Sequence, residues 1–168
     1  MIPLNSIKRC RIILLAIASI SVAGCSSNTG ECKNCTETTF APTAAIRMVD
    51  KTTKQDLFFG PGAKYSTATL RISHVENGRV DTVPAEIKVD TANHLLNFKL
   101  LYMNRVDTIA IQLATLKPQL LYLETGILNS CCTKVIVTSA TLNGSFIFKA
   151  PDDPKKRATM ANVVTVPF

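Results

Sequence analysis

Cysteine is the residue type in this 168-residue chain with the widest choice of chemistry. The stretch Ser21–Cys35, SVAGCSSNTGECKNC, holds three of the six cysteines. Thiols can form disulfides, ligate zinc, exchange electrons or carry a covalent modification. The surroundings of each cysteine decide between these roles, and they indicate one attachment point and a separate set of cross-links. The six lie at Cys10, Cys25, Cys32, Cys35, Cys131 and Cys132.

Residues 1–24 have the organisation of a secretory signal peptide. A basic segment with Lys8, Arg9 and Arg11 precedes the apolar run Ile12–Val22, and the small residues Ala23 and Gly24 follow. The apolar run is shorter than the ~20 residues that a permanent membrane-spanning helix requires. An uncleaved N-terminal anchor is the alternative. The sequence therefore predicts export and cleavage between Gly24 and Cys25.

The four residues Val22–Cys25, VAGC, resemble the lipobox of bacterial lipoproteins. The resemblance implies that the thiol of Cys25 is diacylated and that Cys25 becomes the first residue of the mature chain. Two or three acyl chains form a stable anchor, because each buried CH₂ contributes ~0.8 kcal/mol and one chain alone is marginal. Cys10 would be removed with the signal. The expected partner of Cys25 is thus the membrane, through its lipid.

The residues after Cys25 bear on the location of the lipoprotein. Ser26 favours the outer membrane, because lipoproteins retained in the inner membrane often carry Asp at that position. An acidic cluster after the cysteine directs some lipoproteins to the cell surface, and Ser26–Glu31 offers only Glu31. The periplasmic side and the cell surface both remain open.

Cys32, Cys35, Cys131 and Cys132 are disulfide candidates, because disulfides persist outside the cytoplasm. A direct bond between the adjacent Cys131 and Cys132 would strain the peptide between them. Pairing Cys32 and Cys35 with the other two closes loops of about a hundred residues, for which the chain-entropy model gives ~4–5 kcal/mol per bridge. A thiol-redox site and a four-cysteine zinc site are the alternatives. No metal or cofactor is predicted.

No constellation of catalytic residues is recognisable. His74 and His94 lack partners at ligand or catalytic spacing, and each is interpreted as a surface or half-buried structural histidine. Glu86 and Asp90 could pair in space as two catalytic carboxylates. Asp152 and Asp153 lie between prolines and are interpreted as a solvated turn.

Composition limits the classes of partner. Cleavage after Gly24 removes three cations and no acid, which lowers the formal net charge from +7 to +4. The only basic cluster, Lys155–Arg157, is interpreted as a solvated turn. Nucleic-acid binding is not predicted, because it requires a basic stripe with interleaved aromatic residues.

The chain is expected to comprise a lipoprotein signal peptide (residues 1–24), a lipidated flexible tether (25–42) and one β-sandwich domain (43–168). Short runs of Val, Ile, Leu, Thr and Phe alternate with turn residues, which is typical of an all-β domain. The predicted fold is an antiparallel β-sandwich, immunoglobulin-like or transthyretin-like, with a small β-barrel as the alternative. Asn77–Gly78 and Asn143–Gly144 predict tight hairpin turns. The expected strands are Ala44–Val49, Asp56–Phe59, Thr67–Val75, Arg79–Val83, Glu86–Val89, Leu96–Tyr102, Thr108–Leu113, Leu120–Glu124, Lys134–Ser139, Ser145–Lys149 and Asn162–Val166.

Several segments together resemble small lipoproteins of unknown function that are common in Bacteroidota. They are the VAGC segment, the cysteine-rich residues after it, Arg47–Phe58, Val106–Leu113 and Cys131–Gly144. That group has no assigned catalytic residues, so the resemblance implies an exported, lipid-anchored β domain and no particular reaction.

Two classes of function follow. The first is a non-catalytic binding or accessory module that holds an envelope protein or polymer, with the loops Gly60–Tyr65 and Asn129–Thr133 as the expected contact sites. The second is a hydrolase of envelope or extracellular polymers. A thiol-redox or zinc-binding lipoprotein is a further alternative based on the four cysteines.

Overall fold

The computed structural model describes residues 42–101, 106–129, 133–159 and 162–168. All of them belong to one unit of the chain, Glu37–Phe168. The predicted signal peptide, the tether, all six cysteines and Tyr102 lie outside the described residues, and so does part of the loop Asn129–Thr133.

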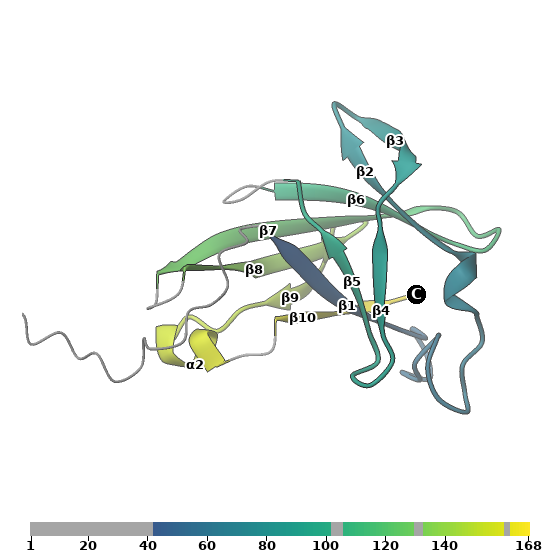
Figure 1. Cartoon of the computed structure of the whole chain (residues 1–168), viewed down its shortest axis with the longest axis horizontal. Helices are drawn as coiled ribbons and strands as arrows, with labels where there is room; N and C mark the ends of the chain where they lie inside the picture. Colours follow the sequence, from purple (N-terminus) through teal and green to yellow (C-terminus); the bar gives the residue numbers. More distant parts are fainter. Residues whose placement is uncertain (1–41, 102–105, 130–132, 160–161) are drawn as a thin grey trace, which may run out of the picture. The chain divides into compact units, whose positions relative to one another are not determined.

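The described residues form mostly β-strands, joined by short turns (Figure 1). In chain order the elements are β1 (Thr43–Val49), the 3₁₀ turn η1 (Thr67–Thr69), β2 (Leu70–Glu76), β3 (Arg79–Pro84), β4 (Ile87–Asp90), β5 (Leu95–Lys99), β6 (Val106–Leu113), β7 (Gln119–Asn129), β8 (Thr133–Leu142), β9 (Ser145–Lys149), the short helix α2 (Pro154–Thr159) and β10 (Val163–Pro167).

The strands form two open sheets. The smaller sheet has the order β10-β1-β5-β4 and the larger has the order β3-β2-β6-β7-β8-β9. This arrangement confirms the predicted all-β sandwich. The alternative of a small barrel is wrong, because the larger sheet ends at β3 and β9 instead of closing on itself. One pair, β1 with β10, is parallel, and every other pair is antiparallel.

The sequence predicted most strands within a few residues of their observed bounds, but Asp56–Phe59 is not a strand. Asp56 makes only an isolated bridge to Val49. Its carboxylate accepts hydrogen bonds from the backbone N–H groups of Phe58 and Phe59, at 2.9 and 3.0 Å. Such local bonds from an aspartate turn the chain and compete with strand pairing.

Three further differences have local causes. The segment Thr67–Thr69 forms a 3₁₀ turn because the Ser66 hydroxyl accepts from the N–H of Ala68. Strands β7 and β8 extend beyond their predicted ends and pair with each other from Leu121–Leu142 to Asn129–Thr133. The predicted turn at Lys155–Arg157 lies instead in α2.

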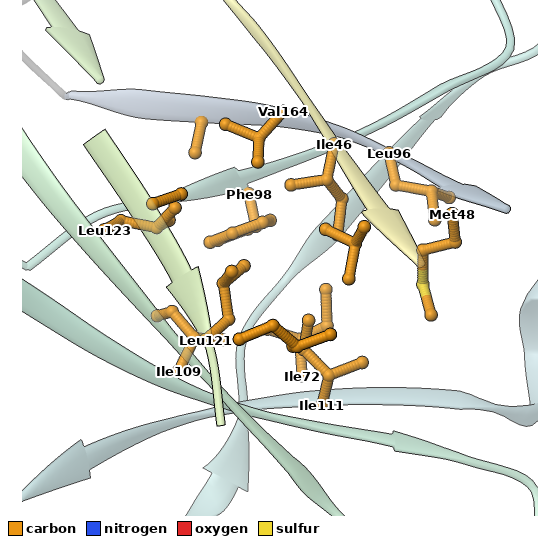
Figure 2. Packing of buried hydrophobic residues seen from close by; sticks show 14 of the residues in the cluster. Ile46, Met48, Ile72, Leu96, Phe98, Ile109, Ile111, Leu121, Leu123 and Val164 are labelled. Carbon is orange, nitrogen blue, oxygen red and sulfur yellow. The ribbon is translucent and has the colours of Figure 1, made fainter. Parts of the chain in front are cut away.

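The core lies between the two sheets and consists of aliphatic side chains around Phe98. Alternation places every second residue of each strand inward. Figure 2 shows the side chains of the smaller sheet facing those of the larger one. The smaller sheet contributes Ile46, Met48, Leu96, Phe98 and Val164, and the larger contributes Ile72, Ile109, Ile111, Leu121 and Leu123, all 2% exposed or less.

Candidate functional site

The outward face of the larger sheet carries a hollow of about 200 Å³ between β2, β3 and β6. Leu70, Ile72 and His74 of β2 point inward, so Arg71 and Ser73, which alternate with them, point outward. Seven residues line this feature, here called the Arg71 hollow: Arg71, Ser73, Val80, Pro84, Ala110, Gln112 and Pro118.

The pairing of β2 with β6 sets the floor of the Arg71 hollow. Arg71 lies opposite Gln112, and Ser73 lies opposite Ala110. Ala110 and Gln112 are two residues apart on β6, so their side chains lie on the same face of the strand. The side chain of Ala110 is small and that of Gln112 is longer. The floor is therefore low at Ala110 and higher at Gln112.

The bend of β3 forms the far wall. Ser73 pairs with Pro84 and Val75 pairs with Val80, so three residues of β3 lie opposite one residue of β2. Extra residues of this kind bend a strand and increase its twist. Figure 1 shows β2 and β3 projecting beyond β6. This bend brings Val80 and Pro84 to the Arg71 hollow.

The lining combines three polar side chains with four apolar ones. Arg71 supplies a permanently charged planar donor, and Ser73 and Gln112 supply a hydroxyl and an amide. No ion pair between described residues involves Arg71. The arrangement can bind an anionic group next to a small apolar one.

Apolar side chains extend from the Arg71 hollow across the sheet. Ala110 pairs with Leu120 of β7, and Tyr122 of β7 pairs with Thr141 of β8, which pairs with Phe146 of β9. Phe146 is 63% exposed and Val80 is 52% exposed. Exposed apolar groups along one face are a feature of interaction surfaces.

The predicted contact loop Gly60–Tyr65 is held to the end of β1 by an ion pair. Lys64 Nζ donates to Asp50 Oδ2 at 2.6 Å, and the N–H groups of Thr52 and Thr53 donate to Asp50 Oδ1. The bond from Lys64 and the two backbone bonds hold the pKa of Asp50 well below its usual range. The same bond raises the pKa of Lys64. Both charges are committed to this turn, which leaves neither free for acid–base work.

A second set of contacts joins the segment before this loop, Asp56–Phe59, and β1 to the turn after β4. The rings of Phe59 and His94 stack with centroids 5.2 Å apart, and Arg47 Nη2 donates to the carbonyl of Asn93 at 2.9 Å. Arg47 Nε lies 4.0 Å from Asp56 Oδ2, a buried oxygen that has no hydrogen-bond partner among the described residues. These groups hold the loop in place.

His74 is buried, so the prediction of a surface or half-buried histidine is wrong. It is 7% exposed and lies on the inward face of β2. Its Nδ1 is 3.4 Å from Oδ1 of Asp107, which is 1% exposed, and Oδ2 of Asp107 accepts from the N–H of Leu101 at 2.7 Å. No sequence pattern indicates this pair, because it depends on the alignment of β2 with β6.

The suggested pairing of Glu86 with Asp90 is wrong. Glu86 precedes β4 and Asp90 ends it, so about four strand residues separate them, or ~13 Å. Paired catalytic carboxylates lie closer, at ~5–9.5 Å. Asp90 instead bonds to the N–H and the side-chain amide of Asn93, and this bonding lowers the pKa of Asp90.

The acids between the prolines make local contacts. Asp152 bonds to Lys149 Nζ at 3.2 Å, and Asp153 accepts from the N–H of Lys155 at the start of α2. Arg157 donates from Nε to the carbonyl of Pro151. The basic cluster therefore stabilises a short helix and its preceding loop.

No group of three or more His, Cys, Asp and Glu side chains within residues 42–168, as far as these are described, is placed to hold a metal ion. In the same residues, no helix is long and apolar enough to cross a bilayer.

Comparisons with protein-family models, with characterised proteins and with solved structures found no match to this chain.

Proposed function

We propose that this chain is a lipid-anchored lipoprotein of the outer membrane whose β-sandwich acts as a non-catalytic binding or accessory module. The VAGC segment at Val22–Cys25 supports the anchor. The Arg71 hollow carries the binding part of the proposal, because it combines an unpaired cation, within the described residues, with neutral polar groups and an apolar floor.

The contacts of the carboxylates also support a binding module over a hydrolase. Asp50, Asp56 and Asp90 each bond to backbone N–H groups that shape a turn. Asp107 bonds to the N–H of Leu101, and Glu124 accepts from the Ser139 hydroxyl at 2.7 Å. A catalytic acid must reach a substrate within hydrogen-bond distance, and these five carboxylates are already engaged within the fold.

The anchor is tested by replacing Cys25 with Ser in the full-length chain. Cells are fed an alkyne-tagged palmitate, and membranes are then separated by density. We expect the parent protein to carry the tag and to sediment with outer membranes, and C25S to carry none. Cys10→Ser is the matched control, since Cys10 lies within the predicted signal and its loss leaves the tag unchanged. A tagged C25S protein would refute the anchor.

The binding part is tested by photo-crosslinking in cells. A photoreactive amino acid replaces Val80, which lines the Arg71 hollow and is 52% exposed. The control position is Val89 on β4 of the other sheet, which is 43% exposed. Irradiation is expected to give a discrete adduct from position 80 and none from position 89. Equal adducts at both positions, or none at position 80, would contradict binding at this face.

A further inference from the structure

We propose that the Arg71 hollow binds a small organic carboxylate, with the carboxylate on Arg71 and the aliphatic part of the ligand over Ala110, Val80 and Pro84. This inference rests on the proposed function and names its class of ligand. Three observations carry it: the charge of the lining, its layout and its size.

The charge of the lining matches a monoanion. Arg71 is the only charged residue among the seven that line the hollow, and Ser73 and Gln112 are neutral. A guanidinium binds a carboxylate through two parallel N–H···O bonds, which is a geometry that lysine does not offer. A phosphate dianion would leave one charge without a counterpart in this lining. The hollow therefore favours a carboxylate over a phosphate.

The layout places charged and apolar groups in different parts of the hollow. Arg71 and Gln112 form one cross-strand pair, and Ser73 and Ala110 form the next pair on the same face. Residues two apart on one strand lie ~7 Å from each other. Val80 and Pro84 come from β3, beyond Ser73. A ligand in the hollow thus meets the cation beside Gln112, and toward β3 it meets the apolar Val80 and Pro84 together with the Ser73 hydroxyl.

The size of the hollow suits a short aliphatic group next to the carboxylate. A volume of about 200 Å³ corresponds to roughly six or seven water molecules at ~30 Å³ each. An acid with a body of about three carbons beyond its carboxyl fills such a space. Butyrate is a suitable probe, and butyramide is its uncharged equivalent of the same shape.

The test is calorimetric titration of the full-length, processed protein in non-ionic detergent and carboxylate-free buffer. The probes are butyrate, butyramide and propylphosphonate. We expect butyrate to bind about tenfold or more tightly than butyramide, as removal of a charge-assisted bond predicts, and more tightly than propylphosphonate. Equal binding of butyrate and butyramide, no binding of butyrate, or preference for the phosphonate would overturn the proposal.

Variants assign the binding to the Arg71 hollow. Arg71→Gln should weaken the binding of butyrate at least about tenfold, and Arg71→Lys should weaken this binding less. Lys51→Gln is the matched control, because it removes a cation from an exposed turn after β1 and should leave the affinity unchanged. Gln112→Glu places a negative charge opposite Arg71 and should abolish the binding of butyrate. This variant provides the same test if R71Q fails to fold. Unchanged affinity in R71Q or in Q112E would place butyrate elsewhere.

The same titration distinguishes two sources of the carboxylate. A tetrapeptide ending in valine is compared with its C-terminally amidated form. If the free-acid peptide binds tighter than butyrate and the amide does not bind, the occupant is a chain terminus. If butyrate binds tighter than the peptide, the occupant is a free small acid. An adduct from position 80 without butyrate or peptide binding would refute the carboxylate and leave the binding function standing.

Discussion

At the scale of single residues, the fold uses its acids mainly to satisfy backbone donors. Asp107 is the most buried acid among the residues that the structure describes, and it bonds to both His74 and the N–H of Leu101. A buried polar group left without a partner costs more than the bond itself contributes. The contacts of Asp107 with His74 and Leu101 are thus expected to fix the position of the chain at Leu101 relative to β2 and β6.

Replacing Asp107 with Ala tests this role. Alanine leaves the N–H of Leu101 and the imidazole of His74 without their acceptor, so the free energy of unfolding should fall by about 3 kcal/mol. Asp107→Asn keeps one carbonyl oxygen and should cost less. Urea unfolding measures both variants. A loss below about 1 kcal/mol in the alanine variant would mean that the contacts are not important for stability.

Asp50 predicts a dependence of stability on pH. Its folded-state pKa is lowered by the bond from Lys64 and by the N–H groups of Thr53 and Thr52. Because the pKa is lower in the folded chain than in the unfolded chain, ionised Asp50 stabilises the fold above about pH 4. This contribution is lost as the pH falls from there toward the folded-state pKa.

The measurement is urea unfolding of the parent protein and of Asp50→Asn between neutral pH and about pH 2.5, a range that spans the unfolded pKa. The parent protein should be the more stable at neutral pH, and the difference should shrink on acidification. The pKa of Asp90 is lowered as well. Because Asp90 is present in both proteins, the difference between their free energies of unfolding isolates the contribution of Asp50. A difference that stays constant with pH would contradict the prediction.

At the scale of elements, local chemistry explains why some strands were predictable and others were not. The turns Asn77–Gly78 and Asn143–Gly144 have positive φ at both residues, as their sequences predicted. The segment Asp56–Phe59 was mistaken for a strand because its apolar residues outweighed the turn that Asp56 forms with the N–H groups after it. Arg71 and Ser73 lie on the outward face because residues of a strand alternate between its two faces, but their pairing with Gln112 and Ala110 depends on strand register, which no local pattern indicates.

The β7–β8 pair contains a close contact that sequence patterns do not indicate. Gly126 lies opposite Ile136, and a Cβ added to Gly126 would lie 2.9 Å from Cγ2 of Thr138. Such a distance requires either the Thr138 side chain or one of the two strands to shift. The glycine therefore sets how closely β8 packs on β7.

A double-mutant cycle measures this contact. Gly126→Ala should destabilise the protein by about 1–2 kcal/mol through overpacking. Thr138→Ser removes Cγ2 and keeps the hydroxyl that donates to the carbonyl of Glu124. In the T138S background the cost of G126A should fall by about 1 kcal/mol. Strictly additive unfolding energies would show that the two side chains do not compete for space.

At the scale of the whole molecule, composition and alternation were sufficient to predict a two-sheet sandwich, but not the order of its strands. The parallel pairing of β1 with β10 joins segments from the two ends of the described chain, and no local signal indicates it. The cysteines are a second long-range feature, and their pairing remains a prediction.

Intact mass spectrometry under non-reducing conditions tests the cysteines in the mature protein. If Cys32 and Cys35 are bonded to Cys131 and Cys132, the mass lacks the hydrogens that two disulfides remove, and thiol reagents label the protein only after reduction. Double replacement by serine of Cys131 and Cys132 should lower stability by several kcal/mol, within the ~4–5 kcal/mol per bridge of the entropy model. Free thiols in the untreated protein, or a retained zinc ion, would contradict the disulfides.

The pairing of β1 with β10 also bears on the timing of folding during export. Val164 and Val166 of the last strand lie fully buried beside Ile46 and Met48 of the first. If the chain is exported as the proposed lipoprotein, the N-terminal part of the domain crosses the membrane first, and β1 emerges long before β10. Contacts between residues so distant in sequence form slowly, because a long loop must close first. On the proposed export route, the smaller sheet would stay incomplete until β10 has crossed the membrane, so the final fold would form only after translocation.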